Sequence, residues 1–303
     1  MKKFFRKLML AALPALAVIM SIELLYRFAP NDYLIKKNML SALGTSAQIL
    51  ILGNSHAYHG LNPQRFSLKC FNAAMVSQSY KYDRLIFEKN KSGLSNLQWI
   101  ILPASIVSFN SELDYSVESW RRDYYKMYYG NKSDQLTFSF LFDIGVIPVA
   151  QRCYQHYVLH KDNLCDAQGF NFDFVSSDSA GMQKDAITSV RRHSTKVCKS
   201  EIPYENISVI IDEAEKMHCK VLLITLPTTV FYRNAISDTT QSAMLNQVAK
   251  LKEEHRNLYY INYTDSPYFG LSDFHDADHL NVAGANKISS MVNDTLLRLD
   301  KKI

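Results

Sequence analysis

The sequence has no internal repeat, no low-complexity segment and no pair with CxxC spacing among its five cysteines. The missing CxxC spacing argues against a zinc knuckle. Away from the ends the chain also has almost no excess of one charge sign. Six basic residues close to the termini account for the net charge of +5: Lys2, Lys3, Arg6, Lys7, Lys301 and Lys302. The rest of the chain is close to neutral, so we predict no basic face and no nucleic-acid partner.

The composition is that of an ordinary globular protein. Hydrophobic residues make up 47% and charged residues 21% of the 303 residues, which supplies enough apolar material for a core. The length allows one large domain or two small ones. Disulfides are permitted if the chain lies outside the cytoplasm, and Cys153 with Cys165 is the first pair to test.

Residues 1–27 have the pattern of a membrane anchor. The basic start MKKFFRK is followed by nineteen residues, LMLAALPALAVIMSIELLY, whose one charge is Glu23. This length can just span a bilayer, and the apolar run continues beyond Ala17, where a cleavable signal would end. We predict an uncleaved transmembrane helix in the inner membrane with its lysines in the cytoplasm, a stalk over residues 28–47 and a periplasmic remainder. A cleaved signal and a buried N-terminal helix of a soluble protein are the alternatives.

Residues 49–63, ILILGNSHAYHGLNP, combine a buried strand with a turn that can deliver a nucleophile. Four apolar residues in a row predict a strand of a parallel sheet that is covered on both faces. Gly53 permits a tight turn that places Ser55 at the strand tip, on the edge of the sheet where ligands bind. The alternative is that Ser55 only caps the next helix.

A histidine and a carboxylate near the C-terminus supply partners for Ser55. Asp276 and His279 lie three residues apart in FHDADHLNVAGANK, at residues 274–287. Serine becomes a good nucleophile when a base takes its proton, and a third group orients that base. We therefore predict a triad of Ser55 as nucleophile, His279 as base and Asp276 as orienting group, with Asp278 as a rival for the last role.

The two motifs together resemble the SGNH/GDSL hydrolase superfamily. GNSH at residues 53–56 is similar to the first block of that family, a Gly-Asp-Ser-Leu-like turn after the first strand. DADH at residues 276–279, with LNVAGA after it, is similar to the Asp-x-x-His block near the family's C-terminus. The resemblance covers residues 48–299 with a long interruption, and it implies serine acyl chemistry without a metal or another cofactor.

The resemblance also implies an oxyanion hole that this sequence matches only in part. The backbone N–H of Ser55 is the first expected donor. The glycine of the family's second block is absent, and Ser77 is the expected substitute. At the place of the third-block asparagine stand Ser105 and, five residues later, Asn110, either of which can donate a hydrogen bond. Ordinary turn and loop polarity is the alternative role for all three.

Other charged and imidazole side chains suggest weaker hypotheses. Two pairs of histidines lie close in sequence: His56 with His59, and His275 with His279. Catalytic zinc needs three protein ligands and an open position, so we predict no metal and expect His56 to border the substrate cleft. Arg191 and Arg192 could bind a carboxylate or an anionic glycan, and a solvated turn is their alternative role.

Alternating strand and helix patterns predict an α/β fold, a three-layer α/β/α arrangement around a doubly wound, mostly parallel five-stranded sheet. Strands are expected at residues 49–52, 70–75, 99–104, 220–226 and 258–264. Helices are expected at residues 80–89, 207–217, 242–254 and 282–299. Ser55, after the first strand, and His279, after the last, would then meet at the same edge of the sheet.

Residues 107–204 interrupt this pattern and are too long for a bare loop. Residues 120–129 have the spacing of a helix with an aromatic face, which indicates packing more often than a binding platform. Residues 169–178, GFNFDFVSSD, alternate like a hairpin arm. We predict an aromatic-rich insertion that acts as a lid or shapes the acceptor pocket.

The resemblance suggests what the chain acts on. Anchored, extracytoplasmic members of this kind add or remove acetyl groups on bacterial envelope polysaccharides, often beside a membrane-bound acyltransferase. We therefore expect a serine-dependent O-acyl esterase or acyltransferase that acts on an envelope or secreted polysaccharide. One alternative is a catalytically inactive glycan-binding or assembly module on the same fold, and a second is a lipase or thioesterase.

Overall fold

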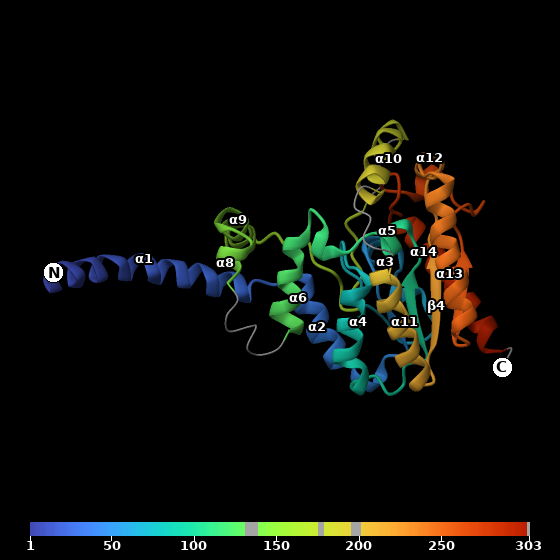
Figure 1. Ribbon diagram of the computed structural model, residues 1–303, viewed down its shortest axis with the longest axis horizontal. Coiled ribbons are helices and arrows are strands. Elements are labelled where there is room, and N and C mark those ends of the chain that lie inside the picture. Colours follow the sequence, from blue (N-terminus) through green and yellow to red (C-terminus); the bar gives the residue numbers. More distant parts are fainter. Residues whose placement is uncertain (131–138, 175–178, 195–200, 302–303) are drawn as a thin grey trace. The chain divides into compact units, whose positions relative to one another are not determined.

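The computed structural model describes residues 1–301 except 131–138, 175–178 and 195–200. The chain forms two compact units (Figure 1). The smaller unit contains Met1–Leu34 and Trp120–Leu164, and the larger contains Ile35–Ser119 and Cys165–Ile303. The predicted insertion at residues 107–204 therefore contributes to both units.

The larger unit is built on one parallel sheet of five strands in the order β2-β1-β3-β4-β5. The strands are β1 (Ile49–Ile51), β2 (Cys70–Asn72), β3 (Trp99–Pro103), β4 (Lys220–Thr225) and β5 (Leu258–Asn262). All five lie within the predicted ranges, so the predicted fold class is confirmed. Because β2 and β3 flank β1, the winding direction reverses between β1 and β3, which is where doubly wound sheets bind ligands.

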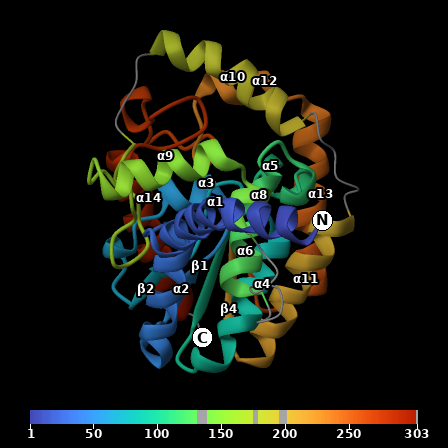
Figure 2. The same cartoon turned by 90° about the vertical axis from the view of Figure 1, so that its left-hand side faces the viewer.

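Helices cover both faces of this sheet (Figures 1 and 2). The helices of the larger unit, with α2 starting in the smaller one, are α2 (Asp32–Leu43), α3 (Ser55–Gly60), α4 (Tyr80–Asn90), α5 (Ile106–Asn110), α10 (Ser179–Ser194), α11 (Glu201–Lys216), α12 (Val230–Ala235), α13 (Asp238–Glu254) and α14 (Val282–Asp300). Single 3-10 turns lie at Gly44–Ser46, Pro63–Arg65, Lys91–Gly93, Leu113–Tyr115 and Leu271–Asp273. Helices α4 and α11 pack together, as do α3 and α14.

The continuous apolar strands follow from burial on both faces. Alternate strand residues such as Ile51, Ile101 and Leu222 share one core with Ile288 and Val292 of α14, because side chains alternate between the faces of a strand. The intervening residues are also fully buried under the opposite layer: Leu50, Ile100, Leu102, Val221 and Leu223. A strand covered on both faces favours apolar residues at nearly every position, and this is why apolar runs in the sequence predicted the strands.

Gly53 lets β1 end abruptly at the ligand-binding edge. Its φ is +117°, and an added Cβ would lie 2.2 Å from Cδ of Pro103 at the end of β3. Both the backbone conformation and the space therefore require glycine. The turn delivers Ser55 directly to the first position of α3.

The smaller unit is helical and rich in buried tyrosines. It contains α1 (Lys2–Phe28), a 3-10 turn at Ser119–Arg121, α6 (Arg122–Tyr129), α8 (Phe140–Asp143) and α9 (Val146–Tyr157). Tyr124 of α6 stacks on Tyr33 with ring centroids 4.6 Å apart, and it also contacts Phe140. The aromatic face predicted for residues 120–129 is therefore a packing surface.

Helix α1 is long and apolar enough to cross a membrane, and its most apolar stretch is not buried by other parts of the chain. A signal sequence passes the same test. Glu23, the one charge in the apolar run, lies at the end that joins the rest of the unit. Its carboxylate accepts hydrogen bonds from the backbone N–H groups of Phe140 and Leu141, at the start of α8, and from Arg27 at 2.7 Å.

Two segments differ in structure from what the sequence suggested. The predicted stalk at residues 28–47 contains helix α2, on which Tyr33, Lys36 and Leu40 are buried. The predicted hairpin arm at residues 169–178 forms no strand over residues 169–174, and the remainder lies outside the described residues. The suggested disulfide between Cys153 and Cys165 is not formed.

Candidate active site

Ser55 lies at the N-terminus of α3, where the chain turns out of β1. Asn54 caps this helix by accepting a hydrogen bond from the backbone N–H of His56 at 3.1 Å, and its own amide donates to Ser108 Oγ at 3.1 Å. The capping role that we considered for Ser55 therefore belongs to Asn54. The Ser55 hydroxyl is left available for a partner from another part of the chain.

That partner is His279, more than two hundred residues away in sequence. Ser55 Oγ lies 2.8 Å from His279 Nε2, and His279 Nδ1 lies 3.0 Å from both carboxylate oxygens of Asp276. Asp276 Oδ1 also accepts the backbone N–H groups of Asp278 and His279 at 3.0 and 2.8 Å. The short Asp-x-x-His turn therefore holds the carboxylate against the imidazole. This is the geometry by which a base activates a serine hydroxyl.

A second carboxylate, Asp278, lies behind the imidazole. Its side chain is 1% exposed, and its Oδ2 accepts a hydrogen bond from His56 Nε2 at 3.1 Å. Its Oδ1 has no hydrogen-bond partner among the described residues and lies 3.8 Å from His279 Nδ1. His279 thus faces two carboxylates, of which Asp276 is bonded to it and Asp278 acts on it through space.

These charges decide the protonation of the site. Burial by itself would lower the pKa of His279, but the carboxylates of Asp278 and Asp276 outweigh burial and raise this pKa to about 9. Burial disfavours the charged form of Asp276, yet its hydrogen bond to His279 lowers the pKa of the carboxyl. The pKa of Asp278 is lowered in the same way, against burial, by His279 and His56. Both carboxylates are therefore negative at neutral pH.

The network continues into helices α10 and α12, which sequence reasoning did not connect to the site. His193 Nδ1 lies 2.8 Å from the hydroxyl of Tyr232 and 3.9 Å from Asp278 Oδ2. Burial lowers the pKa of His193 to about 4, so its ring is neutral. The only sequence signal was the position of His193 beside Arg191 and Arg192, and nothing in the sequence indicated that it would reach Asp278.

An aromatic stack closes one side of the triad. The ring of Phe174 lies between His59 and His275, with ring centroids 3.6 and 4.0 Å away, and meets His279 edge-on at 5.6 Å. Burial lowers the pKa of His59 to about 2, so this imidazole is neutral and packs as an aromatic ring. Phe174 belongs to the segment expected to shape the pocket, but its stacking partners were not foreseen.

Ser77, the expected substitute for the missing glycine, lines the cavity at Ser55. It follows β2, and its φ of +58° is a left-handed conformation that glycine adopts most easily. Its hydroxyl donates to Glu118 Oε2 at 2.6 Å. The backbone N–H groups of Ser77 and Ser55 have no recorded hydrogen-bond partner among the described residues. Both residues line the same cavity, so these two N–H groups are the candidate oxyanion donors.

The structure does not bring Ser105 and Asn110 to that cavity. Ser105 caps α5, where its hydroxyl bonds to Ser108 Oγ at 2.8 Å, and it lines a separate cavity of about 40 Å³. Asn110 is the last residue of α5. The Ser105 side chain forms its hydrogen bonds within the first turn of α5, as serines that precede a helix commonly do.

The cavity at Ser55 has a volume of about 350 Å³. Its lining combines hydroxyl, amide and carboxylate groups from Gln78, Ser111 and Glu118 with apolar side chains such as Val107 and Phe174. Arg192 also lines this cavity, whereas Arg191, on the same exposed turn of α10, is not one of its lining residues. His56 is buried and lines the smaller cavity behind the triad.

One group among the described residues has donor atoms close enough for a metal ion: His56, Asp278 and His279, all within 4.8 Å of one another. These are the side chains of the triad network. His279 is already bonded to Ser55 and Asp276, and His56 to Asp278. The donors are thus arranged as hydrogen-bonded pairs around a serine, and an ion bound here would compete with proton transfer.

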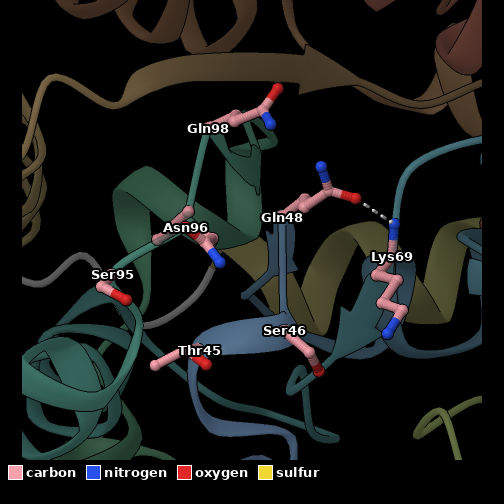
Figure 3. Close-up of a pocket in the computed structure, with 8 residues that line it drawn as sticks. Thr45, Ser46, Gln48, Lys69, Ser95, Asn96 and Gln98 are labelled. Atoms are coloured by element: carbon pink, nitrogen blue, oxygen red, sulfur yellow. Dashed lines mark hydrogen bonds between the residues drawn. The ribbon is translucent and has the colours of Figure 1, made fainter.

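A second hollow, of about 610 Å³, lies at the opposite edge of the sheet (Figure 3). Its lining comes from the segments that precede β1, β2 and β3, and includes Gln48, Lys69 and Gln98. Gln48 Oε1 accepts from the backbone N–H of Lys69 at 3.1 Å. This edge carries the amino ends of the strands, away from the edge at which parallel sheets bind ligands.

No protein-family model matches the sequence, and a search of curated proteins finds no relative. Solved structures of similar fold include a candidate acylhydrolase from Bacteroides fragilis, with 12% identity and a TM-score of 0.41 over 83% of this chain and 87% of that chain. A candidate platelet activating factor protein from Streptococcus pneumoniae has 11% identity and a TM-score of 0.45 over 93% and 99%. A GDSL-like lipase from Bacteroides thetaiotaomicron has 11% identity and a TM-score of 0.41 over 89% and 100%. Identities and TM-scores this low assign no activity to this chain.

Proposed function

We propose that the chain is a serine-dependent acyl hydrolase or acyltransferase of the SGNH type. The observation that carries the proposal is the hydrogen-bonded series Ser55 Oγ, His279 Nε2, His279 Nδ1 and Asp276, with contacts of 2.8 and 3.0 Å. A serine in this arrangement, at the ligand-binding edge of a doubly wound sheet, has the base and the orienting group that nucleophilic catalysis needs.

In the proposed mechanism, His279 takes the proton of Ser55 as Ser55 Oγ attacks the carbonyl carbon of an acyl ester. Asp276 holds the imidazole so that Nε2 faces the serine, and it stabilises the imidazolium that forms. The Ser55 and Ser77 N–H groups bind the oxyanion. His279 then gives its proton to the leaving alcohol, and the acyl group on Ser55 passes to water or to a sugar hydroxyl.

The proposed substrate is an O-acylated polysaccharide of the cell envelope or a secreted polysaccharide. Sugar hydroxyls would bond to polar groups of the cavity such as Gln78, Ser111 and Glu118, and an acetyl methyl would rest on Val107 or Phe174. An anchor at α1 would hold the site outside the inner membrane, where a membrane-bound acyltransferase could supply or receive the acyl group. The apolar part of the same lining favours the second candidate, a lipase or thioesterase.

The test of the chemistry uses the full chain in detergent, with a fluorophosphonate probe and p-nitrophenyl acetate. Labelling and ester release should be present in the wild type. Labelling should be lost in Ser55→Ala, which lacks the nucleophile, and ester release should fall by about six orders of magnitude in Ser55→Ala and His279→Ala. Ser105→Ala should keep its activity, because Ser105 does not line the cavity. A folded wild type with neither labelling nor turnover would instead support the non-catalytic module.

The substrate class is tested separately, with the active protein. Release of acetate from acetylated polysaccharide, compared with turnover of long-chain p-nitrophenyl esters and acyl thioesters, separates the glycan esterase from the lipase or thioesterase. Adding a non-acetylated oligosaccharide to the ester reaction shows whether the acyl group passes to water or to a sugar hydroxyl. Transfer would give an acetylated oligosaccharide, whereas hydrolysis would give only acetate.

A further inference from the structure

Helix α9 (Val146–Tyr157) presents apolar side chains on its outer face. Val146, Ile147 and Tyr154 are 57%, 71% and 55% exposed. They share one face because their spacing follows the helical repeat, and Ala150 and Tyr157 lie on the same face and are also exposed. A helix side that faced only water would carry mostly polar residues, whereas here Gln151 is the polar residue among these apolar ones.

Arg152, the charged residue of α9, and His156 point the other way. Arg152 bonds to the backbone carbonyl of Pro30 and to Asp162, and His156 Nδ1 lies 2.7 Å from the same Asp162. Val149 is fully buried beside them. Arg152 and His156 are therefore tied inward, whereas apolar side chains and the uncharged Gln151 and Gln155 face outward.

The apolar face extends beyond the helix on both sides. Phe142 of α8 is 78% exposed, and Val158 and Leu159, which follow α9, are 58% and 43% exposed. We call this surface the α8–α9 apolar face, made up of Phe142, Val146, Ile147, Ala150, Tyr154, Tyr157, Val158 and Leu159. Single exposed apolar residues are normal, but a contiguous group of this kind marks an interaction surface.

This face adjoins the end of the apolar stretch of α1. Helices α8 and α9 both pack against α1, through Glu23 at the start of α8 and through the Tyr157 hydroxyl, which donates to the carbonyl of Leu25 at 2.9 Å. Helix α9 is seen end-on in Figure 1, where α1 runs lengthwise across the picture, so α9 lies across α1. If α1 crosses a bilayer, α9 lies along the plane of that bilayer at the level where the span ends.

We propose that the α8–α9 apolar face inserts into the head-group and acyl boundary of the same bilayer that α1 crosses. Exposed apolar side chains continue from α1, at Leu24, Leu25 and Phe28, to this face without a charged side chain from α9 on it. Interfacial helices lie in this plane with their apolar side about 5–10 Å deep, and tyrosines such as Tyr154 are suited to the membrane–water boundary. The proposal rests on the membrane anchor proposed above.

The experiment uses the full chain reconstituted in phosphatidylcholine vesicles, with tryptophan placed on α9. Ile147→Trp lies on the face, and Gln155→Trp is the matched control on a different exposed side of the same helix. The wild-type emission of Trp99 and Trp120 is subtracted. Phosphatidylcholine brominated close to the head group should quench roughly half of the Ile147→Trp emission, since bromine quenches at contact and the residue would be at that depth. Lipid brominated near the chain ends should quench it less, and Gln155→Trp should respond weakly to either.

The outcomes separate this inference from the anchor. The anchor itself is measured by vesicle flotation of the wild type, together with a check that α1 has not been cleaved. A protein that floats with the vesicles but shows equal, weak quenching for Ile147→Trp and Gln155→Trp would overturn the inference. The α8–α9 apolar face would then be a binding surface for another protein. A protein that does not float would remove the anchor and the inference together, without affecting the serine chemistry.

Discussion

At the scale of single residues, the site differs from a simple triad by the second carboxylate. Asp276 makes the hydrogen bonds that orient His279, whereas Asp278 contributes charge from a buried position and is itself held by His56. An opposite charge within a few ångströms favours the protonated imidazole. The two aspartates of the DADH motif therefore have separable roles, one geometric and one electrostatic.

The pH dependence of activity should report this arrangement. His279 must be neutral to accept the Ser55 proton, and its pKa is raised to about 9 by the two carboxylates. We expect kcat/KM to rise with pH across the neutral range and to level off on the alkaline side. Asp278→Asn removes one negative charge, so the pKa of His279 falls and the rising limb should move by about one pH unit toward lower pH.

Asp276→Asn is the contrasting variant. It removes the orienting carboxylate and should lower kcat by about four orders of magnitude at every pH. If the pH profile of Asp278→Asn coincides with that of the wild type, Asp278 does not set the pKa of His279 and its role is confined to packing with His56.

At the scale of elements, the position of His279 depends on how α14 begins. Asn281 caps this helix by accepting from the Gly284 N–H at 3.0 Å, while its amide donates to the Ser272 carbonyl at 2.7 Å. An added Cβ on Gly284 would lie 2.2 Å from the carbonyl oxygen of Asp273. The first turn of α14 thus fixes the start of the segment that carries Asp276 and His279.

Gly284→Ala should therefore disturb both stability and catalysis. The methyl group must push the Asp273 backbone away, which we expect to lower the free energy of unfolding by about 1–3 kcal/mol. The shift of the Asp276–His279 segment should lower kcat by roughly 100-fold. Urea unfolding and ester turnover measure the two effects.

Gly93→Ala is the matched control for this substitution. Gly93 has open space around the position of an added Cβ and no left-handed backbone, so the change should stay within about 0.5 kcal/mol and leave turnover unaltered. If Gly284→Ala leaves turnover as unaltered as Gly93→Ala does, α14 can shift without moving His279.

At the scale of the whole molecule, two compact units carry two separate tasks. The larger unit contains the sheet and every residue of the proposed catalytic site, and the smaller contains α1 and the α8–α9 apolar face. The smaller unit interrupts the larger in sequence, since residues 120–164 lie between two parts of the α/β unit. The proposed membrane attachment and the proposed acyl chemistry can therefore be tested independently.

Membrane attachment is tested by the behaviour of α1. We expect the full chain to remain with membranes during alkaline carbonate extraction and to keep its N-terminal mass. Leu13→Lys combined with Leu16→Lys should release it, because each lysine near the centre of a span costs about 2.5–3.5 kcal/mol. Leu297→Lys, also at an exposed leucine but on α14, should stay in the membrane fraction.

A shortened, soluble chain would contradict the anchor and identify residues 1–27 as a cleaved signal. Protease added to spheroplasts measures the orientation. Degradation of the α/β unit while the N-terminal lysines are protected is the result expected for a periplasmic site, and full protection would place that unit in the cytoplasm.

Local patterns in the sequence determined the sheet, the main helices and the residues of the expected triad. Apolar runs such as residues 49–52 indicate strands buried on both faces, and Asp276 and His279 are close enough in sequence for one turn to pair them. These properties depend on neighbouring residues, so the sequence displays them directly.

Only the tertiary structure decided which distant groups meet. His56, His193 and Asp278 come from three separate segments, Phe174 stacks between two histidines far from it in sequence, and Ser77 adopts a left-handed conformation that its residue type does not indicate. Glu23, the one charge in an apolar run, accepts hydrogen bonds at the start of α8 from more than one hundred residues away. Such contacts are set by how the elements pack, and packing brings together residues whose spacing along the chain carries no signal of their proximity.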